Sequence, residues 1–80
     1  MLNTFGKAIR DLFMSKPYNR NIRQTLIIVQ DMLALAEKGD LERVDASCGI
    51  LYGVLRDSAY RLRRMAEDER EKHERSGKWD

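Results

Sequence analysis

The stretch AEKGDLER, Ala36–Arg43, decides the fold, because a Gly-Asp step separates two long helical patterns there. Glycine is common just after the last turn of a helix, and aspartate is a favoured N-cap for the next one. The sequence therefore predicts that one helix ends at residue 38, that Gly39 is its C′ residue, and that Asp40 caps a helix that begins at residue 41. Two helices joined by so short a turn form an antiparallel hairpin.

Apolar residues recur at three- and four-residue spacing on both sides of this turn, as in amphipathic helices. The stripe before the turn predicts a helix over residues 18–38 and consists of Ile22, Leu26, Val29, Leu33 and Ala36. The stripe after the turn predicts a helix over residues 41–75 and consists of Val44, Cys48, Leu51, Leu55, Ala59, Leu62, Met65 and Ala66. Residues 67–75 carry spaced opposite charges and no apolar face, which indicates a solvated extension of the helix.

A third, shorter pattern precedes the single proline, Pro17, and predicts a helix over residues 3–14. Its apolar members are Leu2, Phe5, Ile9, Leu12 and Phe13. The chain is therefore expected to be all-α, with one helical domain over residues 1–75 and a flexible tail over residues 76–80. Trp79, alone in that tail, is either disordered or pins the C-terminal end.

A chain of 80 residues buries only a small core, and small domains usually need a disulfide, a metal or oligomerisation. One cysteine excludes an internal disulfide, and one cysteine with one histidine is too few ligands for a structural zinc site. The helix predicted over residues 41–75 also overhangs its partner. We therefore expect a homo-oligomer, most simply a dimer in which two hairpins form a four-helix-type bundle.

The stretch CGILYGVL, Cys48–Leu55, holds two glycines that each disfavour a helix interior by roughly 0.5 to 1 kcal/mol. A helical wheel places them opposite the apolar stripe, where small residues would let another helix approach closely. The predicted oligomer interface consists of Ala46, Gly49, Gly53 and Tyr60. Two alternatives remain open: the N-terminal helix could fold across this face, or the glycines could merely be tolerated on a solvent-exposed surface.

Basic residues gather in two segments that a hairpin turning at Gly39-Asp40 would bring to one level, with Arg23 near Arg56 and Lys16 near Arg63. This predicted basic belt, a candidate site for phosphates of nucleic acid or another polyanion, consists of Lys16, Arg20, Arg23, Arg56, Arg61, Arg63 and Arg64. The alternative is that the acidic segment of residues 67–74 in a partner chain neutralises the belt.

The sequence indicates no enzyme. Cys48 lies on the apolar stripe, where a buried thiol is inert, and His73 lies about 25 positions away in the charged segment. Glycine-rich phosphate loops, nucleophile elbows and zinc signatures are absent from the sequence, so we expect no cofactor and no metal.

Charged residues interrupt the first thirteen positions, so we expect no secretion signal, and no apolar run approaches the ~20 residues that span a bilayer. The expected location is cytoplasmic, although the first helix could also lie on a membrane surface. The function that follows is a non-enzymatic protein–protein interaction, scaffold or regulatory module that acts as a homo-oligomer. Binding of nucleic acid or a polyanion through the basic belt is the alternative.

Overall fold

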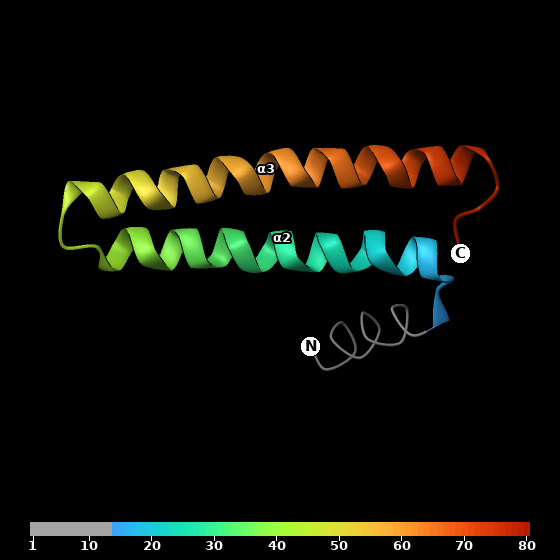
Figure 1. Cartoon of the computed structure of the whole chain (residues 1–80). Coiled ribbons are helices and arrows are strands. Elements are labelled where there is room, and N and C mark those ends of the chain that lie inside the picture. The colour runs from blue at the N-terminus through green and yellow to red at the C-terminus, as the bar shows by residue number, and fades with distance from the viewer. Residues whose placement is uncertain (1–13) are drawn as a thin grey trace.

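The computed structural model describes residues 14–80, and two long α-helices account for most of them. Helix α2 spans Pro17–Glu42 and helix α3 spans Ala46–Arg75. The two helices run antiparallel and side by side over their whole length (Figure 1). The predicted all-helical hairpin is confirmed, whereas the helix predicted over residues 3–14 falls almost entirely outside the described residues.

The turn of the hairpin lies further along the chain than the sequence indicated. Helix α2 continues through Gly39 and Asp40 to Glu42, and the link to α3 consists of residues 43–45. Within residues 14–80, a positive φ occurs only at Gly77, so Gly39 is an ordinary helical residue and not a C′ cap. Asp40 likewise does not cap a helix.

Asp45 is the residue that caps α3. Its backbone is extended, and its Oδ1 accepts hydrogen bonds from the Cys48 backbone N–H at 2.8 Å and from the Ser47 hydroxyl at 2.9 Å. These hydrogen bonds, the one from Cys48 above all, hold the pKa of Asp45 below its usual 3.8. The carboxylate thus satisfies one backbone N–H of the first helical turn that would otherwise have no partner in the helix.

Small residues line the contact between the two helices. We define the helix–helix seam by five buried residues, Val29, Ala36 and Gly39 of α2 with Ala59 and Ala66 of α3. A Cβ atom added at Gly39 would overlap the ring of Tyr52, so this ring lies directly over the glycine. The glycine that the sequence suggested as a helix stop thus serves to let α3 pack closely on α2.

The buried face of α3 is rotated from the predicted stripe. Ala59 and Ala66 are buried as expected, but Leu51 and Met65 are 58% and 59% exposed. Val44, which lies in the turn, is 92% exposed. With small residues turned toward α2, the backbones come close together, and the larger side chains are left at the flanks of the contact.

We expect Gly39→Ala to destabilise the hairpin, although alanine is the better helix former by about 1 kcal/mol. The added methyl group meets the Tyr52 ring, and overpacking typically costs about 1 to 3 kcal/mol. Gly53→Ala is the matched control, since nothing lies within 4 Å of a Cβ there and the substitution should stabilise. Urea unfolding followed by circular dichroism measures both, and equal stabilisation by the two variants would contradict the packing assigned to Gly39.

Asp45→Ala should lower the melting temperature clearly more than Asp40→Ala. Asp45 caps α3, whereas Asp40 makes only exposed ion pairs, with Arg43 at 3.3 Å and Arg56 at 3.9 Å. Asp45→Asn should retain most of the stability, because asparagine caps as well as aspartate. Thermal melts compare the three variants, and a larger loss from Asp40→Ala would place the cap at the wrong residue.

Candidate interaction surfaces

One side of the hairpin carries large apolar side chains from both helices. A residue that immediately precedes a residue of the helix–helix contact projects about 100° away from that contact. The large apolar residues in such positions are Ile28, Leu35, Leu51 and Met65. Two antiparallel helices that lie side by side are related by a two-fold axis normal to the plane that contains both helix axes. Equivalent positions on the two helices therefore lie on the same side of that plane. We call this surface, together with Leu62, the apolar face.

The members of the apolar face are between 38% and 59% exposed. Near the turn, Leu35 of α2 and Cys48 and Tyr52 of α3 line one open hollow of about 320 Å³, which confirms that the two helices contribute to a common surface there. Contiguous exposed apolar surface is unusual on a soluble monomer and marks places where another molecule binds.

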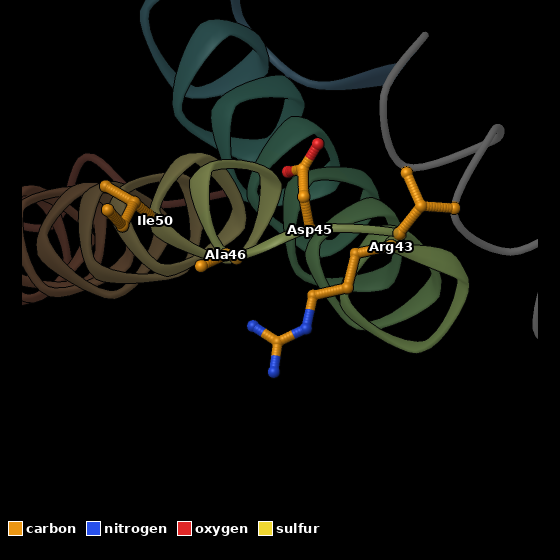
Figure 2. Close-up of a pocket in the computed structure, with 6 residues that line it drawn as sticks. Arg43, Asp45, Ala46 and Ile50 are labelled. Atoms are coloured by element: carbon orange, nitrogen blue, oxygen red, sulfur yellow. The ribbon is translucent and has the colours of Figure 1, made fainter.

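The small-residue positions predicted as an interface lie on the opposite flank of α3. Gly53 is open, with nothing within 4 Å of a Cβ built there, and Tyr60 is 43% exposed. Gly49 differs, because the guanidinium of Arg43 lies over it. Arg43, Ala46 and Ile50 border an open hollow of about 490 Å³ at the turn (Figure 2). Within residues 14–80 no helix covers Gly53, so this flank is also accessible to a partner.

The basic residues do not gather at one level of the hairpin. Because α2 extends to Glu42, Tyr52 faces Gly39, and Arg56 lies 3.9 Å from Asp40 near the turn. Arg23 lies toward the other end, under the ring of Trp79 at 4.3 Å. The prediction that Arg23 lies beside Arg56 assumed a turn at Gly39-Asp40. Because the turn comes later, at residues 43–45, the two arginines lie at different levels.

Several of the remaining basic residues have local partners. Arg63 lies 3.9 Å from Glu67, and Arg20 donates to the Ser15 carbonyl at 3.2 Å. Arg61 and Arg64 are exposed on α3. Binding of nucleic acid or another polyanion stays a prediction, and a continuous belt of all seven residues is not what the hairpin presents.

The last residues of the chain fold back onto the start of α2. Asn19 is fully buried, and its Nδ2 donates to Asp80 Oδ1 and to the Lys78 carbonyl, both at 2.6 Å. Its Oδ1 lies 2.6 Å from Nδ1 of His73. We call this arrangement of Asn19, His73 and residues 78–80 the C-terminal clasp.

The hydrogen bonds of Asn19 determine a proton position on His73. Both amide hydrogens of Asn19 point to oxygen acceptors, so its carbonyl oxygen must be the atom that faces His73. Nδ1 of His73 therefore carries a proton and donates it. The ring is held further by an edge-on contact with Tyr18, with ring centroids 5.4 Å apart.

Asp80 is held by more than one donor. Its second carboxylate oxygen accepts the Lys16 backbone N–H at 2.8 Å, and Arg23 Nη2 donates to the backbone oxygen of Asp80. The hydrogen bond from Asn19, followed by the one from Lys16, lowers the pKa of Asp80 below its usual 3.8. The tail that the sequence described as flexible is thus anchored through Trp79 and Asp80.

The sequence contains a signal for this clasp in the position of two polar residues on the helical period. Asn19 precedes Ile22 by three residues, in phase with the apolar stripe of α2, and His73 follows Ala66 by seven, in phase with the buried face of α3. A polar residue on each inward face at the same end of a hairpin indicates a buried hydrogen bond.

In the part of the chain that the structure describes, no three metal-ligating side chains cluster, and neither helix is long and apolar enough to cross a membrane. Comparison with family models, curated proteins and solved structures gives no significant match to this chain.

Acidification should open the clasp. Since the folded pKa of Asp80 is lowered, its contribution is present above about pH 3.8 and is lost as pH falls through the folded value. The fluorescence of Trp79, the only tryptophan, reports the change between pH 7 and pH 2. The Asn19 amide, the Lys16 backbone N–H and the Arg23 guanidinium act on the same carboxylate, so Asp80→Asn is the control. This variant should lack the acidic transition, and an identical transition in both proteins would contradict the assignment.

Proposed function

We propose that this protein is a non-catalytic interaction module that acts as a homo-oligomer, in which two hairpins pair through their apolar faces to make a four-helix bundle. The observation that carries the proposal is the row of large apolar side chains along the apolar face, each of them between 38% and 59% exposed. Covering such a surface with a partner removes apolar area from water, which stabilises the complex.

The small internal core supports the same conclusion. In residues 14–80, the buried apolar residues are Val29, Ala36, Ala59 and Ala66, and three of these four are alanines. Burial of apolar area contributes about 25 cal/mol per Å², so a contact made of alanines contributes little beside the loss of chain entropy. Covering the apolar face in a second hairpin adds the leucine, isoleucine and methionine side chains that the contact lacks.

A second copy suits the part of this face that lies away from the turn, because Lys38, Glu42 and Arg43 line the face near Leu35. In a two-fold contact each residue meets the same surface of the other copy, so like charges would repel. Between Leu51 and Met65, the polar residue of α3 on this side is Ser58, which carries no charge.

The test is the mass of the protein in solution and its dependence on concentration. We expect the unaltered chain to form a dimer, and Leu35→Lys with Leu51→Lys to raise the dissociation constant by more than about tenfold, because each lysine would bury a charge. Gly53→Leu, on the opposite flank, is the control and should leave the dimer intact. Light scattering and sedimentation equilibrium measure all three proteins.

Three results would contradict the proposal. A monomer at every concentration would mean that the face is covered by something other than a second copy, such as the segment before Met14. A dimer that survives the two lysines but is split by Gly53→Leu would place the interface on the small-residue flank. A lysine variant that is monomeric but keeps the unfolding free energy of the unaltered chain would show that covering this face adds no stability.

A further inference from the structure

We propose that the open end of the hairpin, opposite the turn, is a binding site for a short peptide segment with an aromatic residue followed by an acidic one. The chain's own Trp79 and Asp80 occupy this site in the clasp. The tail is thus an intramolecular ligand that keeps the site closed to outside segments. This inference does not depend on the oligomeric state.

The floor of the site is built for a ligand. With the tail in place Asn19 has no exposed surface, and a buried amide needs partners for both of its amide hydrogens. His73 fixes the orientation of this amide from below, so the two hydrogens point toward the tail. One of them binds a main-chain carbonyl and the other a side-chain carboxylate, a pair of groups that one peptide segment supplies.

The carboxylate is recognised by two donors at once. Asp80 Oδ1 accepts from the Asn19 amide at 2.6 Å, and Oδ2 accepts from the Lys16 backbone N–H at 2.8 Å. An amide side chain would present an N–H₂ group to one of these donors, so the site distinguishes aspartate from asparagine. These donors lower the pKa of Asp80, so its carboxylate stays charged at pH values below its usual pKa.

The aromatic ring is recognised separately. The Arg23 guanidinium lies 4.3 Å from the centroid of the Trp79 ring, a cation–π contact, and also donates to the backbone oxygen of Asp80. The guanidinium of Arg23 thus contacts both the ring of Trp79 and the main chain of Asp80. Removing either the ring or the carboxylate should weaken binding.

The tether explains why the chain's own tail fills the site. Gly77 takes a positive φ of 72°, which turns the backbone away from the axis of α3. The Lys78 N–H then bonds to the His73 carbonyl at 2.7 Å, so the turn is held in place. A segment delivered by so short a link has an effective concentration in the millimolar range, which an outside peptide must exceed.

The experiment uses the full chain with Trp79→Ala and Asp80→Ala, to which a dye-labelled peptide of sequence Ser-Gly-Lys-Trp-Asp is added. Fluorescence anisotropy should show saturable binding at least about tenfold tighter than to the unaltered chain, whose own tail competes. A peptide ending in Trp-Asn is the matched control and should bind several-fold more weakly. Adding Arg23→Gln to the double variant should weaken binding of the Trp-Asp peptide.

Absence of binding to a double variant that keeps its helices by circular dichroism would overturn the proposal, as would equal binding of the Trp-Asp and Trp-Asn peptides. If the double variant loses helix, the unaltered chain labelled with ¹⁵N is titrated with millimolar Trp-Asp peptide. The Trp79 indole signal must then shift to saturation, because displacement moves its ring off Arg23, and an unshifted signal overturns the proposal. Neither outcome changes the mass measured for the oligomer, so this site and the proposed pairing are tested separately.

Discussion

The close approach of α2 and α3 through small residues is the constraint on which the rest of the structure depends. Three alanines, one valine and one glycine line the contact, and the Tyr52 ring lies on Gly39 where any side chain would be in the way. Close backbones gain van der Waals contact, but alanines bury little apolar area. The hairpin therefore holds together along its length without enclosing its own large apolar side chains, which are left on the flanks.

The two ends of the hairpin are closed by different means. At the turn, Asp45 accepts the backbone N–H of Cys48 in the first turn of α3. At the open end, α3 has no apolar residue after Ala66 on its inner face, and the contact with α2 is made by the polar groups of Asn19 and His73. A buried polar contact requires that every hydrogen-bonding group find a partner, and the tail supplies the missing acceptors. The C-terminal clasp thus completes the fold where apolar packing stops.

Much of the architecture was predictable from local sequence. The spacing of the apolar residues predicts two long helices and an antiparallel hairpin, and α3 ends at Arg75 as expected. The turn was misplaced because Gly39-Asp40 resembles a helix stop, and the same glycine is equally suited to a close contact within a helix. That choice depends on Tyr52, which is distant in sequence. Moving the turn by a few residues changed the register and separated Arg23 from Arg56, so the basic belt could not be judged from spacing.

By itself, the sequence determined the class of the fold, the number of long helices and the shortage of internal core, because periodicity and composition are local properties of the chain. Only the tertiary structure decided which face of α3 is buried, where each basic residue lies along the hairpin, and that Asp80 returns to Asn19. These features depend on rotation and register between two helices, and a difference of one residue rotates a helix face by about 100°. Helical propensity does not determine the rotation or register of a helix. The fit of the Tyr52 ring over Gly39 and the hydrogen bonds of the buried Asn19 amide do determine them.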